Sequence, residues 1–120
     1  MRKPEIIHYK GKEVIYIDLS NLKSKDEIIQ LEKQASEMIR SRPVKSVYTL
    51  TNMEGMFFNN DIKSFFEDAV KHNAPFVCCG AVIGLSGLIT IFYNAFLKIT
   101  GRNIKSFRTR DEALEYLAVN

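Results

Sequence analysis

Few residues of this chain stand at spacings that could support acid–base or nucleophilic chemistry. His8 and His72 have no serine, cysteine or carboxylate partner by spacing, and His72 is expected to be favoured by a helix dipole. Asp18 and Glu54 could meet at the rim of a sheet as an acid–base pair, or approach each other as an accident of topology. We therefore predict no catalytic residues and no enzymatic activity.

Metal and thiol chemistry have equally little support in the sequence. It contains no His-x-x-x-His, no Cys-x-x-Cys and no Asp-rich loop, so we predict no metal site and no cofactor. Cys78 and Cys79 are neighbours in the sequence and are poorly placed to form a disulfide with each other. We expect one thiol on each side of a sheet. Buried packing is favoured over a reactive thiol for both. Without a disulfide framework, and without an apolar run in Met1–Lys12, the chain is expected to be cytoplasmic.

One loop carries two methionines and two adjacent phenylalanines where a polar connection would be expected. One of Phe57 and Phe58 is predicted to pack against the following helix as a hydrophobic staple. The other, with Met53 and Met56, could line a pocket or meet a partner, because methionine adapts to varied shapes. Core packing and a functional apolar site are both open for these residues.

Polar loops are predicted to gather at the carboxyl ends of the parallel strands, where ligands bind in α/β sheets. Gly84 and Ser86 belong to the segment Gly84-x-x-Gly87, whose free N–H groups at a helix start could hold an anion. As a phosphate signature it is weak, since there is no GxGxxG and no P-loop lysine. Arg108 lies in another of these loops and completes the predicted ligand or partner surface.

A basic cluster follows, with no acidic residue within it. It comprises Lys98, Arg102, Lys105, Arg108 and Arg110. The cluster is either a solvated surface or a contact for an anionic group such as a lipid head group. The net charge is only +3 and no recognised binding motif is present, so we predict no nucleic-acid partner.

A long uncharged segment, Asn73 to Leu97, decides between a membrane protein and one folded in water. About 20 apolar residues suffice to cross a bilayer, but Pro75 and three glycines interrupt this segment. We interpret it as a buried strand, Phe76 to Ile83, followed by an amphipathic helix, Ser86 to Thr100. A polar stripe along that helix has no use in lipid, so we predict no membrane span.

The outer face of that helix is nearly uncharged. Its polar stripe is flanked by apolar residues, which suits either an ordinary surface helix or contact with a second subunit. The predicted dimer interface consists of Ile91, Tyr93, Asn94 and Leu97.

Strands and helices alternate along the 120 residues, which are enough for one domain, residues 1–120. Predicted strands are Glu5–Lys10, Glu13–Asp18, Val47–Thr51, Phe76–Ile83 and Ile104–Phe107; predicted helices are Ser24–Ser41, one capped by Asn59 or Asn60, Ser86–Thr100 and one capped by Thr109. The order β-β-α-β-α-β-α-β-α predicts an α/β fold with a mostly parallel sheet and an antiparallel N-terminal edge strand.

The first predicted helix shows how its faces are assigned. Ser24 and Glu27 form a capping box, and an apolar stripe follows at helical spacing. The charged residues are assigned to the solvated face: Lys25, Glu32, Lys33, Glu37 and Arg40.

Several short motifs, each weak alone, stand in a fairly specific order along nearly the whole chain. They are Lys10-Gly11-Lys12, Ile15-Tyr16-Ile17-Asp18, Phe58-Asn59, His72-Asn73-Ala74-Pro75, Gly80-Ala81-Val82-Ile83-Gly84, Thr100-Gly101-Arg102 and Phe107 to Leu117. Together they resemble the STAS-like group, which has the fold of the sporulation anti-sigma-factor antagonist, and within it a bacterial branch labelled STAS-like or CRAL-TRIO-like.

The resemblance implies a regulatory or protein-interaction module and not a known enzyme. We predict that it binds a protein partner or itself, as a homodimer through the apolar face of the Ser86–Thr100 helix. STAS antagonists are switched by phosphorylation of a Ser or Thr at the start of the helix after the third strand. The corresponding loop here, residues 52–60, has no hydroxyl residue, so that switch is not predicted. The CRAL-TRIO likeness implies an alternative: a carrier or sensor of a small apolar or lipid-like ligand, with the Met53–Phe58 loop as apolar wall and the basic cluster as head-group contact.

Overall fold

The computed structural model describes residues 2–100 and 104–120, and for residues 88 and 95–100 only their backbone. Its elements are β1 (Glu5–Tyr9), β2 (Lys12–Asp18), α1 (Lys25–Arg40), β3 (Val47–Asn52), α2 (Asn60–Asn73), the short 3-10 helix η1 (Ala74–Phe76), β4 (Val77–Ile83), α3 (Gly87–Thr100), β5 (Ile104–Phe107) and α4 (Arg110–Ala118). Apart from η1, this is the predicted order of strands and helices.

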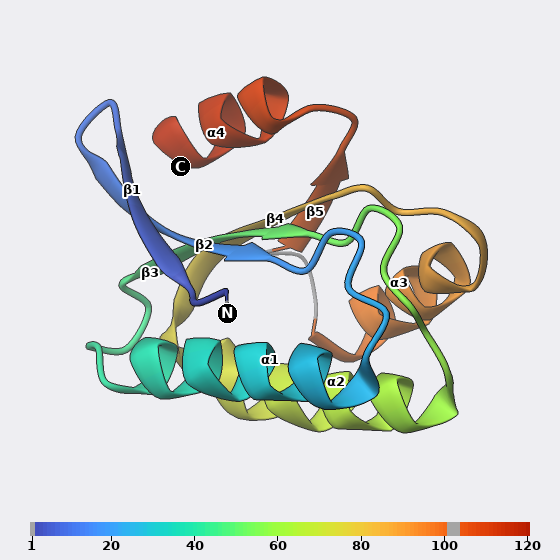
Figure 1. The fold of residues 1–120 in the computed structure, drawn as a ribbon. Coiled ribbons are helices and arrows are strands. Elements are labelled where there is room, and N and C mark those ends of the chain that lie inside the picture. Colours follow the sequence, from blue (N-terminus) through green and yellow to red (C-terminus); the bar gives the residue numbers. More distant parts are fainter. Residues whose placement is uncertain (1, 101–103) are drawn as a thin grey trace.

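Within the described residues the strands form a five-stranded sheet in the order β1-β2-β3-β4-β5 (Figure 1). β1 is antiparallel to β2, and the remaining neighbours are parallel. A tight turn explains the antiparallel pair, since Lys10 and Gly11 adopt positive φ angles of 47° and 84°. Helical crossovers explain the parallel pairs. The predicted mostly parallel sheet with an antiparallel edge strand is confirmed.

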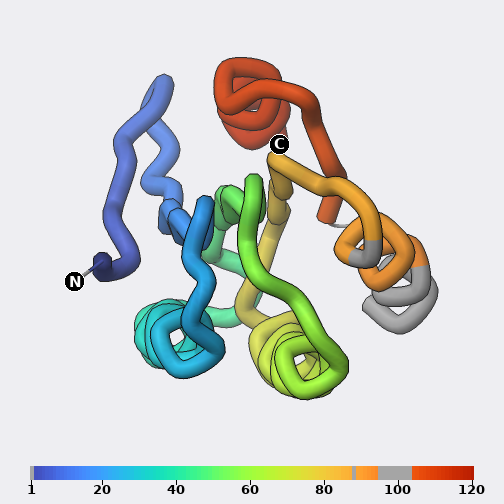
Figure 2. The backbone as a smooth tube through the Cα atoms, turned by 45° about the vertical axis from the view of Figure 1, so that its right-hand side comes forward, coloured from blue at the N-terminus to red at the C-terminus, as the bar shows by residue number. Residues whose placement is uncertain are grey.

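Helices cover both faces of the sheet, as Figures 1 and 2 show: α1, α2 and α3 pack on one face and α4 on the other. The two cores follow from the alternation of side chains along a strand. On β2, Ile15 and Ile17 enter the core beneath α1, whereas Val14 and Tyr16 enter the core beneath α4. The sheet therefore has a thick apolar layer on the α1–α3 side, and this layer contains the cavity described below.

Side-chain caps begin α1, α2 and α4. Ser24, Asn59 and Thr109 each accept the backbone N–H three positions later, at 3.3, 2.9 and 3.2 Å. These bonds confirm the predicted caps at Ser24 and Thr109 and show that Asn59, not Asn60, caps α2.

An irregularity between β3 and β4 changes which residues of β4 face each core. Val47 pairs with Val77, but the next residue of β3, Tyr48, pairs with Cys79, so Cys78 is an extra residue in β4. As a result both cysteines pack in the α4-side core, with their Sγ atoms 3.7 Å apart. The prediction of one thiol on each side of the sheet was therefore wrong.

The uncharged segment is divided as predicted, into strand β4 and helix α3 with a loop between them. Among the helices in the described part of the chain, none combines the length and the apolar character that crossing a bilayer would require.

Candidate functional site

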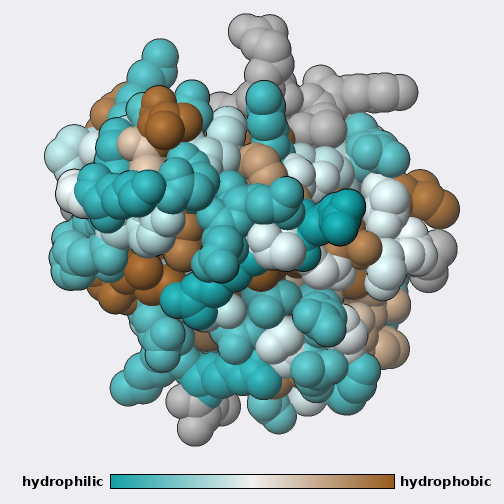
Figure 3. Space-filling model, turned by 90° about the horizontal axis from the view of Figure 1, so that it is seen from above, coloured by the Kyte–Doolittle hydropathy of each residue, from teal (hydrophilic) through white to brown (hydrophobic). Residues whose placement is uncertain are grey.

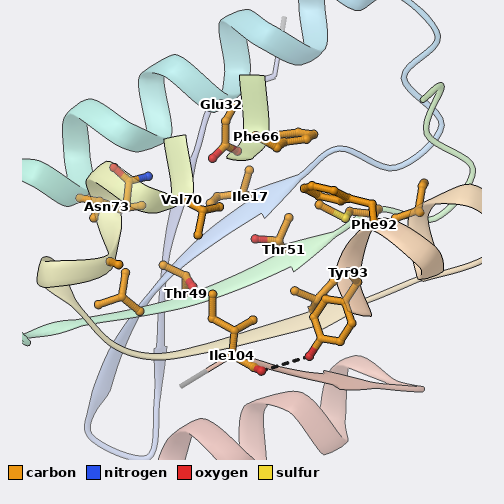
Figure 4. A pocket seen from close by; sticks show the side chains of 16 residues that line it. Ile17, Glu32, Thr49, Thr51, Phe66, Val70, Asn73, Phe92, Tyr93 and Ile104 are labelled. Atoms are coloured by element: carbon orange, nitrogen blue, oxygen red, sulfur yellow. Dashed lines mark hydrogen bonds between the residues drawn. The ribbon is translucent and has the colours of Figure 1, made fainter. Parts of the chain in front are cut away.

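A cavity of about 80 Å³ lies between the sheet and the helices α1, α2 and α3. Its wall is mostly apolar, with Ile17 from β2, Phe66 and Val70 from α2, and Phe92 from α3 (Figure 4). Native cores are close-packed, and voids larger than a water molecule are few in a domain. The position of this one, within the larger core, makes it the first candidate for a ligand site.

The carboxyl group of Glu32 is the most unusual part of the cavity wall. Figure 4 shows it directed from α1 toward Ile17 on the sheet and lying beside Phe66. Glu32 is only 6% exposed, and no described residue forms an ion pair or side-chain hydrogen bond with it. Burial disfavours the charged form and raises the pKa of Glu32 to about 8. The group is therefore mostly protonated at neutral pH.

The prediction that Glu32 lies on the solvated face of its helix was wrong. Glu32 follows the fully buried Ile28 by four residues, and Ser36 follows Glu32 by another four and is also buried. Residues four apart share a helical face. The spacing could have signalled the burial, but the charge of the residue outweighed the spacing in the sequence-based assignment.

Polar groups on the sheet face the same cavity. Thr49 and Thr51 are two residues apart on β3 and therefore share one face of the sheet, so both side chains point toward the helices (Figure 4). Thr49 is buried. Gly80 on the neighbouring strand lies next to Thr49: a Cβ placed there would come within 3.0 Å of both Thr49 Oγ1 and Ile104 Cγ1. A larger residue at Gly80 would therefore crowd this side of the cavity.

Tyr93 closes another side of the cavity from α3. Its hydroxyl donates a hydrogen bond to the backbone oxygen of Ile104 at 3.1 Å, and burial raises the pKa of Tyr93. The residue is 8% exposed. This placement removes Tyr93 from the predicted dimer face, because the aromatic ring turns inward against β5.

A buried polar bridge joins α1 to α2 at the cavity wall. Asn73 donates from Nδ2 to Ser36 Oγ at 3.0 Å and accepts from Arg40 Nε at 2.9 Å. Asn73 lines the cavity, and the guanidinium of Arg40 is bonded to it. Arg40 itself does not line the cavity. The bridge fixes the separation of the two helices above the sheet.

The loop from Met53 to Phe58 is divided between interior and surface. Met53 lines the cavity, and Met56 is buried in the core at 6% exposure. Phe58 is half-buried and places its ring 5.4 Å from that of Phe92 on α3. Phe57 remains 41% exposed. Of the four residues, only Phe57 offers a large apolar side chain to a partner, and the burial of Met56 removes it from the predicted partner surface.

The structure brings Gly84 and Arg108 together but not Ser86. Gly84 and Arg108 line a shallow surface hollow beyond β4 and β5, while Ser86 is exposed outside it. Gly84 has φ +82°, and a Cβ there would lie 2.4 Å from the backbone nitrogen of Glu54. The close approach of two loops is thus sufficient reason for glycine at this position, and no bound anion is needed to explain it.

The basic cluster is partly used within the protein. Lys105 Nζ lies 5.4 Å from the centre of the Tyr116 ring, and the guanidinium carbon of Arg110 lies 4.9 Å from the centre of the Tyr16 ring. The side chains of Lys98 and Arg102 lie outside the described residues. Seen from the α4 side, the coloured surface is mainly hydrophilic with separate hydrophobic spots (Figure 3).

The acid–base candidates are placed in structural roles. Asp18 Oδ1 accepts hydrogen bonds from the backbone nitrogen and the hydroxyl of Ser20, at 3.0 and 2.6 Å, and lies 3.6 Å from Arg2. Glu54 is exposed, and its backbone oxygen accepts from Asn21 at 2.7 Å. These contacts shape a turn and tie two loops together.

The histidines are likewise engaged at the surface. His72 places Nδ1 2.7 Å from the backbone oxygen of Asp68, and His8 lies 3.8 Å from Glu13. In residues 2–100 and 104–120, no cluster of three or more His, Cys, Asp or Glu side chains is arranged to hold a metal ion.

The outer face of α3 keeps part of the predicted dimer surface. Ile91 is 67% exposed and Asn94 is exposed as well. The side chain of Leu97 lies outside the described residues. Ile91 is therefore the position at which an α3 interface can be tested.

A comparison with solved structures identifies the architecture. The chain is similar to an anti-sigma-factor antagonist (STAS) domain protein from Planctomyces limnophilus, with 16% identity and a TM-score of 0.63 over 98% of this chain and 99% of that one. No protein-family model matches the sequence, and no curated protein sequence does. The match gives no support to the CRAL-TRIO part of the resemblance. The chain has a STAS-like fold.

Proposed function

We propose that this domain is a regulatory module that acts by binding a protein partner and has no enzymatic activity. The STAS-like fold along almost the whole chain carries the proposal, because the matched structure is that of an anti-sigma-factor antagonist. The exposed ring of Phe57 supports it, since a large apolar side chain exposed in a loop can anchor a partner.

Phosphorylation at the start of α2 is not part of the proposed regulation. The N-cap of α2 is Asn59, whose side chain already accepts the N–H of Ile62 at 2.9 Å. Residues 52–60 contain no hydroxyl group that a kinase could modify. Any switch at this loop would act through binding.

A second copy of the chain is the partner we propose for the α3 face. An aliphatic side chain as exposed as Ile91, at 67%, gains by burial against another subunit. Sedimentation velocity at micromolar concentration should show a dimer for the unmodified protein and a monomer for Ile91→Asp. Val44→Asp is the matched control, because Val44 is 63% exposed in a loop away from α3 and should leave the dimer intact.

The outcome of that experiment is decisive for self-association. A monomeric unmodified protein, or a dimer that survives Ile91→Asp with its helical content unchanged, would contradict the α3 interface. A dimer that both substitutions dissociate would contradict it as well, since the effect would not be specific to α3.

The cavity supports a second candidate function, the sensing of a small apolar ligand. An engineered cavity of about 150 Å³ accommodates benzene, so a cavity of about 80 Å³ suits a smaller molecule and is too small for a lipid chain. Under xenon pressure, NMR methyl signals of the cavity-lining Ile17 and Val70 should shift, and those of Leu117 in the opposite core should not. Equal shifts at all three residues would contradict a specific site.

A further inference from the structure

We propose that the cavity beneath α1 binds a short aliphatic amine, with the ammonium group paired to the carboxylate of Glu32. The proposal rests on the second candidate function and specifies the chemistry of its ligand. The observation behind it is a carboxyl side chain, 6% exposed, that points into a largely apolar cavity and has no hydrogen-bond or ion-pair partner among the described residues.

The described residues that line the cavity supply no positive charge. Among the described residues that line the cavity, Glu32 and Tyr93 are the titratable groups, from α1 and α3; those contributed by β2, β3, β4, β5, η1 and α2 carry no charge. The hydroxyl of Tyr93 is occupied by its bond to Ile104. The guanidinium of Arg40, on α1, is held by Asn73. When Glu32 loses its proton, none of the described residues offers it a counter-charge, and the ammonium group of the ligand supplies one.

The acid also distinguishes an amine from a neutral ligand. A glutamine could bind an alcohol or an amide without the cost of burying an ionisable group. Unlike the amide of glutamine, a carboxyl group can lose its proton and attract a cation. A nearby opposite charge favours the ionised form of the carboxyl group. Thr49 and Thr51 supply hydroxyl oxygens on the sheet side of the cavity, where the remaining N–H donors of an ammonium group would need acceptors.

The dimensions of the cavity limit the ligand. Scaled from the six carbons that an engineered 150 Å³ cavity holds, a cavity of about 80 Å³ takes roughly three or four non-hydrogen atoms. n-Propylamine has this size, and n-propanol is its uncharged counterpart of equal length. The apolar walls formed by Phe66, Val70 and Phe92 suit the alkyl chain.

The test is an NMR titration of the intact protein at pH 7 with n-propylammonium chloride and, separately, with n-propanol. We expect the amine to bind at least tenfold more tightly than the alcohol and to shift the methyl signals of Ile17 and Val70. Glu32→Gln should reduce the amine affinity at least tenfold. Glu37→Gln is the matched control, because Glu37 lies on α1 but is exposed, and it should leave the affinity unchanged.

A pH series adds a signature that a merely structural glutamate would not produce. Burial raises the pKa of Glu32 to about 8, so the amine must displace a proton at neutral pH. The affinity should then rise by about tenfold per pH unit between pH 6 and pH 7.5. In the unmodified protein, saturation with the amine should move the titration of the Glu32 carboxyl carbon to lower pH, which keeps the test valid if Glu32→Gln fails to fold.

The outcomes separate this inference from the function on which it rests. Equal affinity for amine and alcohol, or unchanged amine binding in Glu32→Gln, would overturn the role of Glu32. If xenon enters the cavity and the amine does not, the apolar site stands and the amine inference falls. If neither enters, both fall. Val70→Phe, which fills the cavity from α2, should abolish binding of either probe.

Discussion

Phe58, in the loop before α2, and Phe92, in α3, hold their ring centres 5.4 Å apart at an interplanar angle of 41°. This tilted pair attaches the β3–α2 loop to the helix that closes the cavity. The residue before Phe58, Phe57, is exposed at the surface. Two adjacent residues of the same type therefore have opposite environments, one packed against α3 and one exposed at the surface.

Substitution by alanine should distinguish these two environments. Phe58→Ala removes a packed ring and should lower the free energy of unfolding by about 2–3 kcal/mol. Phe57→Ala should change it by less than about 0.5 kcal/mol, because the ring is 41% exposed. Urea denaturation followed by circular dichroism measures both, and equal losses would show that the loop is not divided in this way.

Glu32 should make the stability depend on pH. The pKa of Glu32 is raised from 4.5 to about 8 by burial, so between these values the folded protein binds more protons than the unfolded chain. The free energy of unfolding therefore falls as the pH rises through this range, by up to about 1.4 kcal/mol per pH unit.

Glu32→Gln should remove that dependence, leaving the variant close to the unmodified protein at pH 4.5 and more stable than it at pH 8. Denaturation curves at half-unit pH intervals provide the measurement. Glu37→Gln serves as the exposed control on the same helix. A slope that persists in Glu32→Gln would assign the pH dependence to another group.

Asn73 should contribute to stability through its two side-chain bonds. Asn73→Ala leaves the buried hydroxyl of Ser36 and the guanidinium of Arg40 without this partner. Loss of a buried hydrogen-bonded group costs about 1–3 kcal/mol. Asn60→Ala, at an exposed position at the start of α2, should cost less than about 0.5 kcal/mol. Similar effects of the two substitutions would argue against the bridge between α1 and α2.

Gly84 and Gly11 offer a matched pair for testing the contact between loops. Both have positive φ, +82° and +84°, but a Cβ at Gly84 would clash with Glu54, while a Cβ at Gly11 meets nothing within 4 Å. Gly11→Ala should cost about 1 kcal/mol from backbone strain alone. Gly84→Ala should cost distinctly more in thermal denaturation, and equal costs would mean that the loops yield easily.

Local sequence patterns determined most of the architecture. Helical spacing and capping residues located the helices, since the N–H groups at a helix start need nearby acceptors, and Ser24 and Thr109 provide them. A tight turn at Gly11 forced β1 and β2 to be antiparallel, and intervening helices forced the remaining strands to be parallel. These are short-range effects, so the amino-acid sequence alone is sufficient to predict them.

Tertiary packing decided the candidate site. Whether Glu32 faces water or the core depends on how α1 rotates against the sheet, and the bulge at Cys78 shifts which residues of β4 face each core. The inward turn of Tyr93 depends on β5, which follows α3 in the chain. Such contacts join different elements of the fold, and the free energy gained by close packing outweighs the polarity of a single side chain such as Glu32, whose charge had favoured the solvated face.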